Sequence, residues 1–211
     1  LRAGKHVMVE KPLAISREQA NLVKKAQMET GLIVTSNLVL RKSPRFAEIK
    51  RRISRGEMGE LYLLEGDYIH SIEPQLTKRR RYTEIEFYSP IFGGAIHLLD
   101  LVRWLADEEV VEVCAMGTNK IMANTSYPFD DTNLLLMRFQ NGAIAKIGVT
   151  VVPKHPKYHS LRVFGSKATF VNSLGDGKWH TNDAENEPSM VQEAYPGVDK
   201  GDLLPTFLKA V

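Results

Sequence analysis

The first 36 residues place an amphipathic stretch between two apolar runs. The runs are Val-Met-Val at residues 7–9 and Leu-Ile-Val-Thr at residues 32–35, and the stretch between them carries small apolar side chains at helical spacing. Ser16 followed by Gln19 is the pattern of a capping box at a helix start, and Gly31 is a suitable helix stop. Unbroken apolar runs are typical of strands buried on both faces, so the sequence predicts two strands of a parallel sheet joined by a helix.

The pattern changes after a helix predicted over residues 48–55, which Gly56 and Gly59 close. Apolar runs then follow one another through tight turns, at residues 61–64, 110–116, 134–139, 143–152 and 161–164. Asn141-Gly142 between two of them predicts a hairpin with a type I′ turn. The predicted fold class is α/β plus α+β: the tail of a Rossmann-like parallel sheet, then a large, mostly antiparallel open sheet covered by helices on one face. A last helix is predicted from Asp202.

Another amphipathic helix is predicted where a Gly93-Gly94 pair precedes His97. Apolar residues at positions 98, 101, 102 and 105 form one stripe, while His97, Asp100, Arg103 and Asp107 share the opposite arc. The glycine pair predicts a side-chain-free turn that lets a ligand approach the helix start. A histidine at such a position is also compatible with a purely capped or solvated role.

Charged residues follow the first predicted strand directly. Glu10 and Lys11 stand at its end, and Pro12 restricts the backbone of Lys11. Ligands bind at this edge of open α/β sheets, so a backbone-restrained lysine there is a candidate for chemistry. The pattern is equally compatible with a solvated strand end.

Composition narrows the class of protein. The chain has 211 residues, 43% hydrophobic content and a net charge of +3, and no apolar run approaches the length of a membrane span, so we expect a cytoplasmic protein without membrane contact. Basic runs at residues 50–55 and 78–81 fit an exposed helix face and a loop better than nucleic-acid binding. Cys114 lies in an apolar run and is predicted to be buried. The histidines other than His97 show no zinc-ligand spacing, so no metal is predicted.

Two motifs in this order resemble the glucose-fructose oxidoreductase / inositol dehydrogenase family, Gfo/Idh/MocA. The first is Glu10-Lys11-Pro12 after a strand, and the second runs from Gly93-Gly94 through His97 and Asp100 to Trp104-Leu105. In that family the Lys-Pro bond is commonly cis, the lysine lies beside nicotinamide and substrate, and the histidine is the general acid/base. Many members carry an aspartate four residues before the histidine, where this sequence has Gly93.

The resemblance implies a dehydrogenase that oxidises a hydroxyl of a sugar, cyclitol or related polyol with NAD or NADP. It implies roles for the residues at the matching positions: catalytic Lys11, His97 and Asp100; cofactor-binding Glu10, Lys11, Pro12 and Asn37; substrate-binding Lys11, Arg41, Gly94 and His97. It also implies residues 1–38 as the remnant of an NAD(P)-binding domain, residues 39–211 as a substrate-binding and oligomerisation domain, and a homodimer or homotetramer formed through the open sheet.

Two other functions are compatible with the same sequence. The sequence contains no Gly-x-Gly-x-x-Gly turn for cofactor phosphates, and its first residues resemble the end of a helix, so we expect a truncated chain. One alternative is therefore a non-catalytic module that binds substrate and dimerises. An NAD-dependent glycosidase of the same fold is the other. The basic run 78–81 with Tyr82 and Tyr88 receives no assigned role.

Overall fold

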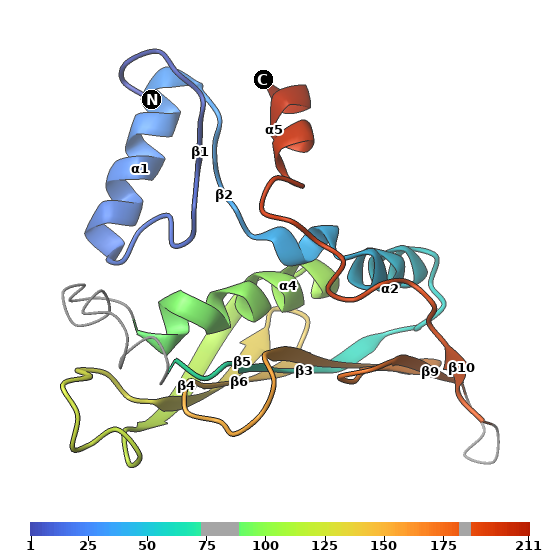
Figure 1. Cartoon of the computed structure of the whole chain (residues 1–211). Helices are drawn as coiled ribbons and strands as arrows, with labels where there is room; N and C mark the ends of the chain where they lie inside the picture. Colours follow the sequence, from blue (N-terminus) through green and yellow to red (C-terminus); the bar gives the residue numbers. More distant parts are fainter. Residues whose placement is uncertain (73–88, 182–186) are drawn as a thin grey trace.

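A computed structural model describes residues 1–72, 89–181 and 187–211 (Figure 1). The chain begins with a β-α-β unit made of β1 (Val7–Val9), α1 (Arg17–Thr30) and β2 (Val34–Ser36), in which β1 and β2 pair in parallel. Ser16 Oγ accepts the Gln19 N–H at the helix start, and Gly31 ends the helix with a φ of 65°. The predicted strand–helix–strand order is confirmed. The second strand begins two residues later than predicted because the Leu32 and Ile33 N–H groups bond side chains, Thr30 Oγ1 and His6 Nδ1.

A 3₁₀ turn, η1 (Val39–Lys42), leads from this unit into α2 (Pro44–Ser54) and then into the large sheet. The sheet contains β3 (Leu61–Ile69), β4 (Val110–Thr118), β5 (Thr132–Phe139), β6 (Ile144–Thr150), β7 (Tyr158–Gly165), β8 (Ala168–Asn172), β9 (Gly177–Thr181) and β10 (Ser189–Met190). In the described residues the strand order is β10-β9-β8-β7-β3-β6-β5-β4, and every pair is antiparallel except β3 with β6. The predicted large, mostly antiparallel sheet is therefore confirmed.

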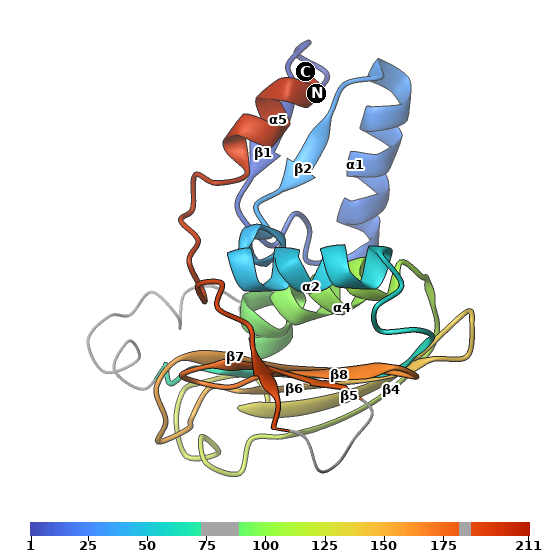
Figure 2. The ribbon, with the colours of Figure 1, turned by 90° about the vertical axis from the view of Figure 1, so that its right-hand side faces the viewer.

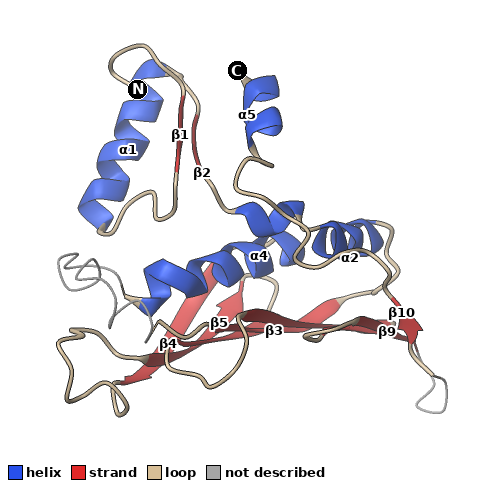
Figure 3. Ribbon diagram, viewed as in Figure 1, coloured by secondary structure: helices blue, strands red, loops and turns tan. Residues whose placement is uncertain are grey.

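Helices cover one face of this sheet and leave the other bare (Figures 1 and 3). A π-helical turn, η3 (Ile91–Ala95), continues directly into α4 (Ile96–Ala106), which packs on β3, β6, α2 and η1. The predicted apolar stripe Leu98, Leu101, Val102 and Leu105 is completely buried. The core therefore lies between α4, α2 and the inner face of the sheet.

The chain returns from the sheet toward the β-α-β unit through residues 191–203, here called the C-terminal strap, and ends in α5 (Leu204–Ala210) (Figure 2). Arg45 on α2 secures the strap: its guanidinium donates to the Glu193 carbonyl and to Asn172 Oδ1, each at 2.9 Å, and lies 5.7 Å from the Tyr195 ring centroid. Because Arg45 is buried, these contacts hold the strap tightly against α2 and the sheet.

Two local predictions were wrong. Cys114 is exposed, because β4 is the edge strand and this residue lies on the face that helices leave bare. The β5–β6 turn is not type I′, which needs positive φ at both central residues. The Gly142 N–H donates to the Phe139 carbonyl, so the central residues of the turn are Gln140 and Asn141, and neither has a positive φ. Gly142, with a φ of 91°, follows them. Within the described residues, no helix combines the length and apolarity required to cross a bilayer.

Candidate active site

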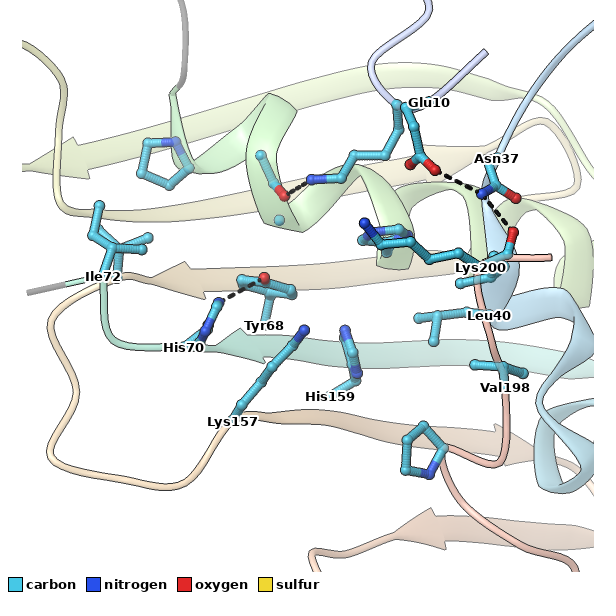
Figure 4. A pocket seen from close by; sticks show the side chains of 18 of the residues that line it. Glu10, Asn37, Leu40, Tyr68, His70, Ile72, Lys157, His159, Val198 and Lys200 are labelled. Carbon is cyan, nitrogen blue, oxygen red and sulfur yellow. Dashed lines mark hydrogen bonds between the residues drawn. The ribbon is translucent and has the colours of Figure 1, made fainter. Parts of the chain in front are cut away.

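A cavity of about 480 Å³ lies where the β-α-β unit, the sheet and the C-terminal strap meet. Its polar walls come from the end of β1, from β3, from the η3–α4 segment, from β7 and its preceding loop, and from the strap (Figure 4). The polar and glycine residues that line it are Glu10, Lys11, Asn37, Tyr68, His70, Gly93, Gly94, His97, Tyr127, Lys157, His159, Tyr195, Asp199 and Lys200. The fold thus gathers side chains up to 190 positions apart in the sequence, from Glu10 to Lys200, around one cavity.

Lys11 enters this cavity from the end of β1. Its Nζ donates to the Gly93 carbonyl, and the Lys11–Pro12 bond is cis, as the resemblance implies. Burial lowers the pKa of Lys11, and so do the nearby Lys157 and Lys200, while Glu10 raises it. Pro12 itself does not belong to the described cavity wall. The structure therefore places a half-buried amine at the cavity, held against the start of the α4 segment.

The glycine pair does not form the open turn that the sequence predicts. Gly93 and Gly94 are buried inside the π-helical turn, so the helical path begins before His97 and no free helix N-terminus faces a ligand there. A Cβ on Gly94 would lie 2.4 Å from carbon atoms of the Tyr68 ring. Gly94 is therefore needed for close packing against Tyr68, and the Gly93 carbonyl accepts from Lys11.

His97 projects from the first turn of α4 into the same cavity. Its Nδ1 is buried and has no hydrogen-bond partner in the described part of the chain. Burial, followed by the positive charges of Lys11 and Lys157, lowers the pKa of His97 to about 4. This value lies well below the unperturbed pKa of histidine, about 6.5. At neutral pH the imidazole is uncharged, so it can accept a proton from a ligand.

Two further histidines, missed by the sequence analysis, line the cavity. His159 on β7 is 8% exposed, and its ring centroid lies 6.1 Å from that of His97. Its backbone N–H donates to Tyr195 Oη and its Nδ1 lies 2.8 Å from the same oxygen. His70 Nδ1 lies 3.0 Å from Tyr68 Oη. Neither histidine belongs to a motif, and only the alternation of strand residues would have placed His159 on the inner face.

Burial is also the main cause of the shifted pKa values of the histidine and tyrosine side chains at this cavity. It lowers the pKa of His159 to about 3, with smaller contributions from His97, Lys157 and His70, and it lowers the pKa of His70. It raises the pKa of Tyr195, whose hydroxyl therefore keeps its proton and can donate to His159 Nδ1 while accepting the backbone N–H. Within the described residues, no group of histidine, cysteine and carboxylate side chains has the arrangement of a metal site.

Asn37 marks the end of the cavity nearest the β-α-β unit. Its Nδ2 donates to Glu10 Oε1 at 3.0 Å and to the Lys200 carbonyl at 2.9 Å (Figure 4). Its Oδ1 is buried without a hydrogen-bond partner in the described residues. A buried acceptor without a donor is costly, so this oxygen suits a ligand that supplies an N–H group.

Arg41 and Asp100 lie together but apart from this cavity. The Arg41 guanidinium binds the Asp100 carboxylate in a bidentate pair, with Nε to Oδ2 at 2.7 Å. Arg41 also lies 5.9 Å from the Trp104 ring centroid, in a separate polar groove of about 310 Å³. Neither residue lines the described cavity wall. The structure thus differs from the prediction that Arg41 contacts substrate, and Asp100 bonds Arg41 rather than His97. The run 78–81, Tyr82 and Tyr88 lie outside the described residues.

A β-α-β unit joined to an open mixed sheet, with a ligand-sized polar cavity between them, defines a two-part α/β protein. Residues 46–171 match the family model described as the GFO/IDH/MocA C-terminal domain. Since this match covers more than half of the chain, the protein belongs to the Gfo/Idh/MocA family.

Curated relatives and solved structures agree with this assignment. Inositol 2-dehydrogenase 2 of Saccharopolyspora erythraea is 28% identical over 72% of this chain and 42% of its own length. The scyllo-inositol 2-dehydrogenase (NAD(+)) of Bacillus subtilis is 28% identical over 81% of this chain and 49% of its own. This chain thus spans about half the length of the curated relatives it matches.

Solved structures share the fold. A levoglucosan dehydrogenase in complex with NADH and levoglucosan has a TM-score of 0.80 at 20% identity, over 95% of this chain and 57% of its own. An inositol dehydrogenase homologue from Azotobacter vinelandii, complexed with NAD+, has a TM-score of 0.78 at 18% identity, over 96% of this chain and 55% of its own. At these identities the likeness shows the fold alone.

Proposed function

We propose that this chain serves an NAD(P)-dependent dehydrogenase that oxidises a hydroxyl group of a sugar, cyclitol or related polyol. The observation that carries the proposal is that Lys11 and His97 line the same cavity. His97 is neutral at neutral pH, and its buried Nδ1 has no hydrogen-bond partner in the described residues. The names of the relatives, inositol dehydrogenases, support the substrate class. Residues 1–38 would then be part of the cofactor domain, and residues 39–211 would bind substrate.

The residues at the β1 end of the cavity fit the nicotinamide end of the cofactor. Asn37 Oδ1 is a buried acceptor suited to a carboxamide N–H, and Glu10 holds the other side of the same amide. Lys11 and Pro12 follow Glu10 at the strand end where cofactors bind in open α/β sheets. These residues would hold the nicotinamide ring, which would supply the hydride acceptor for the substrate carbon. Either NAD or NADP is compatible with these residues.

The side chains supply proton transfer and charge stabilisation. His97 accepts the hydroxyl proton as the carbinol carbon is oxidised, which its neutral state permits. The Lys11 ammonium hydrogen-bonds the same oxygen and stabilises its developing negative charge. The buried Gly94 and Tyr68 fix the segment that carries His97. Asp100 and Arg41 contribute by holding α4 against η1, and thereby position His97 without contacting it.

The test is a titration of this chain with NADH and NADPH, followed by nicotinamide fluorescence, together with assays on myo-inositol, scyllo-inositol and levoglucosan. Saturable binding of one cofactor and net NAD(P)H formation with at least one polyol would support the proposal. Cofactor-dependent cleavage of a glycoside without net NAD(P)H would favour the glycosidase instead. If the chain neither binds cofactor nor oxidises a polyol, the dehydrogenase proposal is wrong for it.

We also propose that the bare face of the sheet forms a homodimer or homotetramer. Strand pairing places Met116, Leu134, Leu136 and Ile144 on this face, and they are 76%, 49%, 56% and 44% exposed. A contiguous exposed apolar surface of this kind is typical of subunit interfaces. Leu136→Lys is expected to give a monomer in sedimentation equilibrium, while Leu22→Lys on α1, where the leucine is 62% exposed, leaves the assembly unchanged. A wild-type monomer at high concentration would contradict the proposal.

A further inference from the structure

Lysines from three separate elements reach the cavity. Lys11 follows β1, Lys157 immediately precedes β7, and Lys200 lies on the C-terminal strap. Figure 4 shows the side chains of Lys157 and Lys200 extending into the pocket, with Lys157 between His70 and His159. Oxidation of a neutral polyol, as proposed above, requires Lys11 and His97 but assigns no role to Lys157.

The carboxylates of the described cavity wall belong to other elements than Lys157. Among the described lining residues, the acids are Glu10 and Asp199. Glu10 bonds the amide of Asn37, which also binds the Lys200 carbonyl, and Asp199 precedes Lys200 in the strap. Asn37 thus links Glu10 to the backbone carbonyl of Lys200, not to its ammonium.

The Lys157 end of the cavity carries positive charge and uncharged rings. Tyr68, His70 and His159 lie beside Lys157 (Figure 4), and Lys157 forms no ion pair with a carboxylate in the described part of the chain. The positive charge of Lys157 contributes to lowering the pKa of His70, His97 and His159, so it acts on all three rings. At neutral pH the three imidazoles add no positive charge of their own, yet they offer N–H donors.

We propose that the cavity selects a polyol that bears an anionic group, a carboxylate or a phosphate, and that Lys157 binds this group while Lys11 and His97 meet the reacting hydroxyl. The substrate class is therefore a sugar acid or a sugar phosphate, and this inference rests on the function proposed above. Lys157 is an exposed residue at the cavity wall. The anion supplies a counter-charge for it, and a charge-assisted hydrogen bond is stronger than a neutral one. The cavity volume of about 480 Å³ accommodates a six-carbon chain beside a nicotinamide ring.

The same arrangement gives the anion a second effect. A negative charge beside Lys157 offsets a cation that lowers the pKa of His97, so a bound sugar acid raises the basicity of that imidazole. A neutral polyol provides no such charge. Selection of an anionic substrate would thus act on catalysis as well as on binding.

The experiment compares three ligands with the same six-carbon skeleton: D-sorbitol, D-gluconate and D-sorbitol 6-phosphate. Binding to the chain is followed without cofactor through the imidazole NMR signals, for the wild type, Lys157→Met and the control Lys120→Met. Lys120 is exposed and lies outside the described cavity wall. We expect gluconate or the phosphate to bind about tenfold more tightly than sorbitol, the magnitude of one charged hydrogen bond. Lys157→Met should remove this advantage without changing sorbitol affinity, and Lys120→Met should preserve it.

Equal affinities for all three ligands, an advantage that survives Lys157→Met, or no binding of either anion would overturn the inference. A parallel loss of NADH affinity in Lys157→Met, as large as the loss for the sugar acid, would assign the lysine to the cofactor and also overturn it. Failure of the dehydrogenase proposal has a different signature. Anions would then bind in a Lys157-dependent manner, but no ligand would give NAD(P)H in the linked assay.

Discussion

Replacement of His97 by alanine is expected to lower kcat for polyol oxidation about a thousandfold, the usual range for loss of a positioned acid/base group. The reason is that, among the described residues, only His97 both lies near the Lys11 amine and has a buried imidazole nitrogen without a hydrogen-bond partner. His97→Gln keeps the size of the side chain without a titrating group and should be similarly impaired. Turnover measured at saturating substrate, with NADH affinity as a second readout, checks the result.

The dependence on pH gives an independent readout. Since the pKa of His97 is lowered to about 4, the imidazole is neutral above this value, and oxidation should decline only as pH falls through it. This acid limb of kcat/KM should be absent from His97→Ala. The matched control is His180→Ala, because His180 lies on β9, outside the described cavity wall. A His97→Ala protein with normal melting and normal turnover would remove His97 from the mechanism.

Lys11→Met should lower kcat for the same reaction by about a hundredfold, comparable to the loss of one donor that stabilises an oxyanion. Methionine keeps much of the apolar stem but removes the ammonium that donates to the Gly93 carbonyl at the cavity wall. Because the charge of Lys11 also lowers the pKa of His97, the substitution should shift the acid limb of the pH profile to higher pH. A purely structural lysine would not move this limb.

Lys5→Met is the matched control, because Lys5 is exposed at the approach to β1 and lies outside the described cavity wall. It should retain turnover and the position of the acid limb. If Lys11→Met retains wild-type turnover as well, the amine has no part in the chemistry. If turnover falls but the limb stays in place, Lys11 does not act on His97 as the structure indicates.

Much of the fold was predictable from local pattern. The capping residues Ser16 and Gln19, the stop at Gly31 and the stripe on α4 each reflect forces within a few residues, and each prediction was confirmed. The failures involve neighbours distant in sequence. Cys114 lies in an apolar run, yet it is exposed because its strand is the last in the sheet, and strand order is not encoded within that run.

The candidate site likewise contains some residues that local motifs predict and others that depend on distant parts of the chain. Lys11 and His97 lie in motifs that the sequence displays, and both reach the cavity. His159 and Lys157 have no motif, because their place depends on the register of β7 against β3, which brings His159 opposite Tyr68. The resemblance implied a catalytic Asp100, but this residue lies outside the described cavity wall, and the guanidinium of Arg41, distant in sequence, binds its carboxylate.

Asn37 joins three parts of the chain through one amide, which donates to Glu10 after β1 and to Lys200 on the strap. The cavity is therefore assembled only after the first and last segments have both docked, and such long-range closure comes late in folding because chain entropy opposes it. A ligand that fills the cavity touches all of these segments at once. Its binding free energy consequently adds to the stability of their docking, so occupancy and correct assembly of the two parts rise together.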